Sequence, residues 1–178
     1  MNESTDYITK AIERTFETEI EQTEKFIDGI LASKKIFIYG VGRSGLIAKA
    51  FAIRLVQMGL EVFFIGETIT PIVEQGDLVV IVSYTGETMS AIQTANIVRR
   101  VGATVVTITA SDHSKLTSAS NIVVRILPPK DDEKKRLAPL GTLFEDATLI
   151  YLDGIVSVLM EKLGQSEGSM RRRHAIWV

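Results

Sequence analysis

The stretch Lys35-Ile-Phe-Ile-Tyr-Gly-Val-Gly-Arg-Ser-Gly45 decides the fold class of this chain. Its first five residues form a run of β-branched and aromatic side chains, which predicts a short buried strand. The next six contain three glycines and lead into a helical pattern. A strand that turns at glycine into a helix is typical of parallel α/β proteins, so this stretch predicts that class.

The same pattern continues along the chain. Similar strand-like runs occur at residues 62–65, 78–82, 104–109 and 122–126. Helical spacing separates several of them, first through Leu46, Ala50 and Ile53, and later through Ala91, Ile92, Ala95 and Val98. Strands that alternate with helices predict right-handed crossovers and a parallel sheet covered on both faces.

The N-terminal region has apolar residues at three- and four-residue spacings, which predicts one amphipathic helix over about residues 4–32. The positions are Ile8, Ile12, Phe16, Ile20, Thr23, Ile27 and Ile30. Such a helix should pack against the sheet core, which is expected over about residues 35–127.

The C-terminal region begins with Pro128-Pro-Lys-Asp-Asp-Glu-Lys-Lys-Arg136, a charged segment that predicts an exposed loop. A helix is predicted over residues 142–163, within a helical region that extends to about residue 174. It carries two apolar stripes, one through Ala147, Ile150, Gly154 and Val158 and one through Leu149, Leu152, Val156 and Leu159. One stripe can cover the sheet, and the other predicts a subunit interface.

Composition narrows the classes of function. The chain has 178 residues and is 46% hydrophobic, which suits a single domain spanning residues 1–178. Twenty basic against twenty-two acidic residues give a net charge of −2, which argues against nucleic acid as a partner. There is no cysteine, and no early apolar stretch resembles a signal peptide or a membrane span. We therefore expect a cytoplasmic protein without a membrane partner.

Two loops carry the chemistry, because ligands of open parallel sheets bind beyond the carboxyl ends of the strands. The first follows the strand at residues 35–39 and opens a helix, so its backbone N–H groups can converge on an anion. The second follows the strand at residues 78–82 and adds three hydroxyl groups. The predicted phosphate ligands are Gly42, Arg43, Ser44, Ser83, Tyr84, Thr85, Gly86, Glu87 and Thr88.

The two loops also fit roles that involve no phosphate. Either loop can serve only as a tight connection or a helix cap. Gly40, Gly42 and Gly45 also match the G-x-G-x-x-G pattern of dinucleotide-binding domains, with Glu67 at about the distance of a ribose-binding acid. That dinucleotide interpretation predicts an oxidoreductase and leaves the hydroxyl-rich second loop unused.

Four blocks resemble the sugar isomerase (SIS) domain family, and within it the 6-phospho-3-hexuloisomerase branch. They are Gly40-Val-Gly-Arg-Ser-Gly45, Gly66-Glu-Thr68 with Thr70-Pro71, Ser83-Tyr-Thr-Gly-Glu-Thr88 and Pro139-Leu-Gly-Thr-Leu-Phe-Glu145. The resemblance runs over nearly the whole chain, to His174-Ala175. It departs at Tyr84, where glycine is common in the family, and in the residues after His174.

This resemblance implies a five-stranded parallel sheet of flavodoxin-like order, a homotetramer and no cofactor. It implies interconversion of D-arabino-hex-3-ulose 6-phosphate and fructose 6-phosphate, beside a hexulose phosphate synthase in the ribulose monophosphate pathway of formaldehyde fixation. Ser44 and residues 83–88 would contact the phosphate, and Glu145 would accept the proton. His174 would serve the active site, either that of its own subunit or that of a neighbouring one.

The residues themselves leave alternatives to these roles. Moving a carbonyl from C3 to C2 through an enediol requires a base, and a carboxylate in a partly dry site suits that work without a metal. Glu145 can instead complement the dipole of its helix, and Glu87 is expected mainly to do so. His174 can be a packing or exposed residue, although the apolar Ile176, Trp177 and Val178 suggest a tail that docks. A non-catalytic SIS domain that senses sugar phosphates would need neither Glu145 nor His174.

Overall fold

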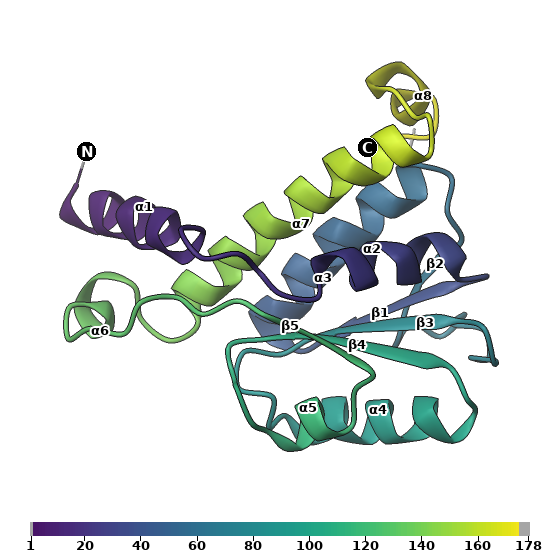
Figure 1. Cartoon of the computed structure of the whole chain (residues 1–178), viewed down its shortest axis with the longest axis horizontal. Coiled ribbons are helices and arrows are strands. Elements are labelled where there is room, and N and C mark those ends of the chain that lie inside the picture. The colour runs from purple at the N-terminus through teal and green to yellow at the C-terminus, as the bar shows by residue number, and fades with distance from the viewer. Residues whose placement is uncertain (1, 175–178) are drawn as a thin grey trace.

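A computed structural model of the protein describes residues 2–174 (Figure 1). Its sheet consists of β1 (Ile36–Gly40), β2 (Val62–Phe64), β3 (Leu78–Val82), β4 (Thr104–Thr109) and β5 (Ile122–Arg125). All neighbours are parallel, in the order β2-β1-β3-β4-β5. The predicted five-stranded parallel sheet of flavodoxin-like order is therefore confirmed.

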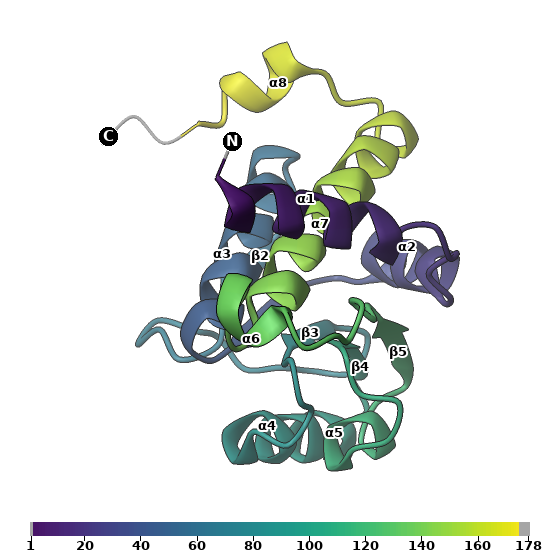
Figure 2. The same cartoon turned by 90° about the vertical axis from the view of Figure 1, so that its left-hand side faces the viewer.

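Helices cover both faces of the sheet. They are α1 (Glu3–Thr15), α2 (Thr23–Ala32), α3 (Gly42–Gln57), α4 (Met89–Arg100), α5 (Lys115–Ser118), α6 (Lys134–Leu137), α7 (Thr142–Lys162) and α8 (Glu167–Arg171). Figures 1 and 2 show α2, α3 and α7 on one face and α4 with α5 on the other. The result is a three-layer α/β/α arrangement whose two cores are separated by the sheet.

Alternation along β1 explains the two cores. Ile36 and Ile38 are buried in the cluster under α2, α3 and α7, which includes Phe26 and Phe144. Phe37, between them, is buried in the cluster with α4 and α5. Successive strand side chains point to opposite faces, so a strand buried on both sides is mostly apolar or β-branched along its length. Short apolar runs in the sequence therefore mark the strands.

The N-terminal region differs from the prediction of one helix, because it forms α1 and α2. The break lies at residues 16–22, and Gln22 has a left-handed backbone with φ of 66°. Phe16 and Ile20 within the break pack against the main core. A continuous helix of this length would carry α1 past the sheet, whereas the break lets α1 lie against α6 and α7 (Figure 1).

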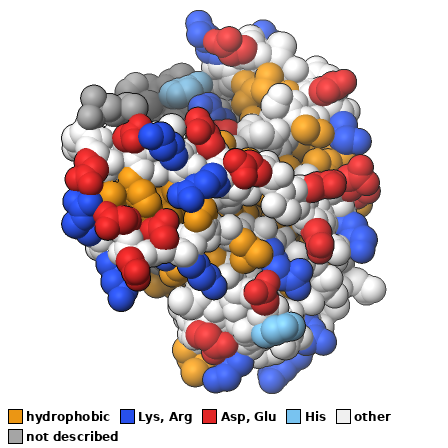
Figure 3. Space-filling model, turned by 60° about the vertical axis from the view of Figure 1, so that its left-hand side comes forward, with side chains coloured by type: hydrophobic (Ala, Val, Ile, Leu, Met, Phe, Trp, Pro, Cys, Tyr) orange, Lys and Arg blue, Asp and Glu red, His pale blue; other side chains and the backbone are white. Residues whose placement is uncertain are grey.

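The helices α3 and α7 lie where the periodicity predicts them, but part of their apolar surface is exposed. On α3 the predicted stripe faces outward, with Leu46 67% and Ile53 57% exposed, while Phe51 and Leu55 pack on the sheet. On α7 Ile150 is 50% exposed. Figure 3 shows one face of the molecule, where apolar side chains lie among interspersed acidic and basic ones.

Candidate active site

The first predicted phosphate loop is a tight turn from β1 into α3. A Cβ atom on Gly45 would lie 2.5 Å from the carbonyl oxygen of Gly40, so a side chain there would push strand and helix apart. Gly42 has φ of +59°, and a Cβ on it would meet open space. No side chain caps the N-terminus of α3, which leaves its first N–H groups available to a ligand.

The second loop repeats this arrangement after β3. Ser83 follows the strand, and Thr88 occupies the N-cap position of α4 without a side-chain capping bond. The Ser83 hydroxyl donates to Thr88 Oγ1 at 3.4 Å, and Thr85 Oγ1 accepts from the N–H of Glu87 at 3.3 Å. A second uncapped helix N-terminus, surrounded by hydroxyl groups, therefore lies at the same edge of the sheet.

The structure brings the two loops together. β1 and β3 are neighbours with Gly40 opposite Val82, so the loops leave the sheet side by side. Between them is a cavity of about 190 Å³. It is lined by Val41, Ser44, Val82, Ser83, Tyr84, Thr85, Thr88 and Ala91. Two positive helix ends and several hydroxyl groups meet there, which is an arrangement that suits an anion.

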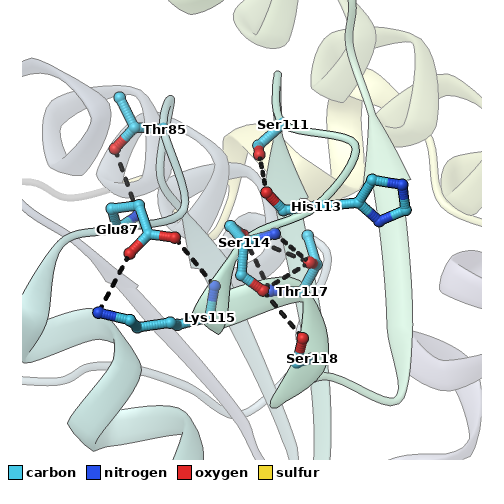
Figure 4. Close-up of polar contacts among 8 residues, drawn as sticks. All are labelled: Thr85, Glu87, Ser111, His113, Ser114, Lys115, Thr117 and Ser118. Atoms are coloured by element: carbon cyan, nitrogen blue, oxygen red, sulfur yellow. Dashed lines mark hydrogen bonds and ion pairs between the residues drawn. The ribbon is translucent and has the colours of Figure 1, made fainter.

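A network behind the second loop holds it in place (Figure 4). The Glu87 carboxylate accepts from the backbone N–H of Lys115 at 3.1 Å and lies 3.8 Å from its ammonium. Gly86 has φ of +67°, and a Cβ there would overlap the Ser114 hydroxyl. Figure 4 shows the His113 imidazole pointing away from this network. In this structure Glu87 braces the loop, and its predicted ligand role stays a prediction.

Glu145 of α7 contacts Ser44, one of the residues that line this cavity. Its carboxylate is buried in the first turn of the helix, where Oε1 accepts from the Ser44 hydroxyl at 3.3 Å. Since Ser44 also lines the cavity, the structure brings the predicted base into contact with one of the predicted phosphate ligands. Gly141 makes room for this carboxylate, because a Cβ there would lie 3.1 Å from Glu145 Cδ.

Arg43 connects the first loop to α7. Its Nε lies 3.2 Å from Glu145 Oε2, and its Nη2 lies 2.7 Å from Asp146 Oδ1. Its Nη1 donates to the Thr142 hydroxyl at 3.3 Å. The predicted phosphate contact of Arg43 therefore stays a prediction, while the guanidinium orients the carboxylate of Glu145.

His174 lies far from Glu145 within the chain. It lines a separate cavity of about 430 Å³ with Arg54 and Gln57 of α3, Met160 of α7 and residues of α8. Glu145 is in the first turn of α7 and Met160 is near its end, which places them about 22 Å apart along the axis. One chain does not bring the two predicted catalytic residues together. Ile176, Trp177 and Val178 lie outside the described residues.

Sequence reasoning missed a cation beside the second loop. Lys134 of α6 donates from Nζ to the Tyr84 hydroxyl at 2.7 Å, and its ammonium lies 5.0 Å from the centre of that ring. The Tyr84 ring also contacts Phe144, with ring centres 5.3 Å apart. The sequence of the charged segment that contains Lys134 could not predict this contact, because Lys134 and Tyr84 are fifty positions apart in the chain.

Topology argues against the dinucleotide interpretation. In the dinucleotide-binding domain, which is built from two βαβαβ halves, the third strand pairs with the second strand. Here β3 pairs with β1 instead, on the side of β1 that faces away from β2. Glu67, the candidate ribose ligand, forms an ion pair with Lys49 at 3.0 Å. Gly40 and Gly45 are instead explained by the close packing of strand and helix, and Gly42 by its positive φ.

Within residues 2–174, no group of three or more acidic or histidine side chains is arranged to hold a metal ion. In the same part of the chain, no helix combines the length and the apolar character needed to cross a bilayer.

Comparison with known proteins decides the family. A family model described as the SIS domain matches residues 29–144. The chain belongs to the SIS domain family. It is 38% identical over 159 residues to the 3-hexulose-6-phosphate isomerase of Bacillus subtilis (strain 168), covering 87% of this chain and 86% of that protein. The 3-hexulose-6-phosphate isomerase of Methanocaldococcus jannaschii is 34% identical over 151 residues, covering 85% and 81%.

Solved structures agree with this SIS assignment. A Methanococcus jannaschii protein, from whose structure a function of 3-hexulose-6-phosphate isomerase was inferred, has a TM-score of 0.88 at 31% identity. The alignment covers 99% of this chain and 100% of that one. These relatives confirm the predicted family and the predicted class of enzyme, a sugar-phosphate isomerase.

Proposed function

We propose that this SIS protein interconverts D-arabino-hex-3-ulose 6-phosphate and fructose 6-phosphate without a cofactor. The names of its relatives support the substrate, and one observation supports the site. Ser44 lines the cavity between the two phosphate loops and donates to Glu145. The groups that would bind the phosphate therefore lie next to the carboxylate that would transfer the proton.

The phosphate would bind between the N-termini of α3 and α4. Both termini lack a side-chain cap, so their free N–H groups and partial positive charge face the cavity. The hydroxyls of Ser83, Thr85 and Thr88 supply further donors around the same space. Each helix terminus contributes on the order of 1 kcal/mol to binding an anion.

Glu145 would move the proton. Starting from the 3-ketose, its carboxylate removes the proton from C2, and the electron pair of that bond forms the C2–C3 double bond of an enediol. The same carboxylate returns a proton to C3, while the C2 hydroxyl loses its proton and the C3 oxygen gains one. Arg43 holds the carboxylate from one side and Ser44 from the other, which fixes it for this transfer.

His174 fits this scheme only through assembly. Met160, which lines the same cavity as His174, lies about 22 Å along α7 from Glu145. His174 would therefore serve the site of a neighbouring subunit, where an imidazole can exchange protons with the sugar oxygens. The exposed apolar residues of α3 and α7 supply a surface for such contacts. We propose a homotetramer on this basis and on the family resemblance, acting in the cytoplasm beside a hexulose phosphate synthase.

One experiment tests the proposed function directly. The protein is incubated with fructose 6-phosphate labelled with carbon-13, and the products are identified by NMR. We expect signals of a 3-ketose phosphate that appear only with protein present. If folded protein leaves the fructose 6-phosphate unchanged after prolonged incubation, the assignment is wrong.

A second candidate is a SIS domain that senses sugar phosphates without converting them. The cavity between the two loops supports it, because phosphate binding there does not need Glu145. The same NMR experiment separates the two functions, since a sensor would bind fructose 6-phosphate and form no product.

A further inference from the structure

Lys134 places an ammonium group at the phosphate loop. Its Nζ donates to the Tyr84 hydroxyl and also lies over the Tyr84 ring. Tyr84 belongs to the lining of the cavity between the two loops. The short helix α6 therefore brings a positive charge into contact with a residue that lines the proposed phosphate site.

Two acidic residues beside Lys134, Asp131 and Glu133, have partners other than its ammonium, and Asp131 also accepts from the Lys134 backbone N–H at 3.1 Å. Asp131 accepts from the Tyr7 hydroxyl at 2.6 Å, and this bond holds the pKa of Asp131 below its usual range. Glu133 lies 2.6 Å from a guanidinium nitrogen of Arg136. Within residues 2–174, no carboxylate oxygen lies at ion-pair distance from Lys134 Nζ, whose partner is the neutral phenol of Tyr84. Among those residues, the ammonium of Lys134 therefore has the Tyr84 hydroxyl as its partner and no carboxylate.

Among the residues that the structure describes, none that lines the cavity carries a positive charge. The lining consists of apolar residues, hydroxyl residues and Tyr84. Arg43, the cation of the first loop, pairs with both Glu145 and Asp146. A phosphate monoester carries up to two negative charges near neutral pH, so hydroxyl groups and helix ends alone leave much of that charge without a counterion.

We propose that Lys134 and Tyr84 together form the cationic part of the phosphate site. The phenol oxygen accepts a hydrogen bond from the ammonium, which leaves the phenolic hydrogen free to be donated to a phosphate oxygen. Lys134 supplies the positive charge and Tyr84 supplies the donor. Tyr84, which departs from the glycine common in the family, thereby becomes a ligand. This inference rests on the proposed phosphate site.

Titration calorimetry with inorganic phosphate and with fructose 6-phosphate tests this pair. The variants are Lys134→Met, Tyr84→Phe, their combination, and Lys135→Met as the matched control on the same helix turn. Lys134→Met should raise the Kd for both ligands about 10-fold, because a charge-assisted contact is lost. Lys135→Met, which changes an exposed lysine in the same way, should stay within about 2-fold.

Two further readouts separate the pair from general surface charge. Raising the salt concentration should weaken phosphate binding less in Lys134→Met than in the wild type, since screening acts on the missing charge. Tyr84→Phe should raise Kd about 3-fold, and the double variant should bind more weakly than Lys134→Met but lose less than the product of the two single losses, because the two residues are coupled through their hydrogen bond. The melting temperature of each variant verifies folding.

The outcomes are distinct from those of the isomerase assay. Equal Kd values for Lys134→Met and wild type, or equal losses in Lys134→Met and Lys135→Met, overturn the proposal. A loss for fructose 6-phosphate without one for inorganic phosphate also overturns it, since the cation would then serve the sugar. A Lys134-dependent phosphate affinity in a protein that forms no 3-ketose supports the pair and contradicts only the proposed reaction.

Discussion

The hydroxyl of Ser44 lies 3.3 Å from Oε1 of Glu145, although the two residues are 101 positions apart in the chain. Ser44 lies in the first turn of α3 beside the phosphate loops, and Glu145 lies in the first turn of α7. The contact therefore joins the place where an anion can bind to the carboxylate that can move a proton. The site depends on keeping these two helix ends together.

Gly141→Ala should impair catalysis without unfolding the protein. The added Cβ would lie 3.1 Å from Glu145 Cδ and about as close to both carboxylate oxygens, so the carboxylate must move. We expect kcat to fall about 10-fold or more, since small misplacements of a base are costly. Gly29→Ala, whose Cβ would make only an ordinary contact with Leu78, is the control. A kcat equal to that of the control would contradict the placement of the base.

Gly86→Ala should destabilise the fold more than Gly42→Ala. Both glycines have positive φ, but the Cβ of the first would overlap Ser114 while that of the second meets open space. Backbone strain alone costs about 1–2 kcal/mol, and the overlap adds about 1–3 kcal/mol at Gly86. Urea unfolding of both variants measures the difference. Equal losses of unfolding free energy would mean that the 111–118 segment does not brace the loop.

Ile150→Asp should break the proposed oligomer. Ile150 lies on the exposed apolar side of α7, where a buried charge at an interface would be costly. Light scattering should show a multimer for the wild type and smaller species for the variant. Ile97→Asp, a change at a similarly exposed position on the opposite face of the sheet, should leave the mass unchanged. A wild type that is monomeric at micromolar concentration would refute the interface.

Mixing variants tests the role of His174. Glu145 lies in the first turn of α7, whereas His174 lines a cavity near the C-terminal end of that helix. We therefore expect His174→Asn and Glu145→Gln chains, each impaired alone, to regain activity when reassembled together. Partial recovery would show that one chain completes the site of another. A His174→Asn protein with unchanged kcat across the pH range would instead make the histidine structural.

The sheet could be predicted from sequence because its strands are buried on both faces. Residues 78–82 and 104–109 were predicted with the bounds that the structure has, since each is a short run rich in β-branched residues that lies between turn residues. The loops were predictable for a related reason. The ends of the strands determine where the two loops leave the sheet, and glycine and hydroxyl residues in the sequence indicate the loops themselves.

Side-chain pairing and helix orientation were not predictable in the same way. Nothing in the sequence indicated that Arg43 would turn to the carboxylates of α7 or that Lys134 would reach Tyr84, because both contacts depend on tertiary packing. The stripe through Leu46 and Ile53 correctly indicated a helix, but it lies on the exposed side. Periodicity shows that a face is apolar and does not show which neighbour covers it.

The most direct test of the central claim is the kinetics of Glu145→Gln in deuterated water, with phosphate binding measured on the same sample. The substitution keeps the shape of the side chain and removes the base. We predict that kcat and deuterium incorporation into the sugar fall by about 10²- to 10⁴-fold, while the Kd for inorganic phosphate changes little. A variant that turns over and exchanges deuterium at the wild-type rate would contradict the claim that Glu145 transfers the proton.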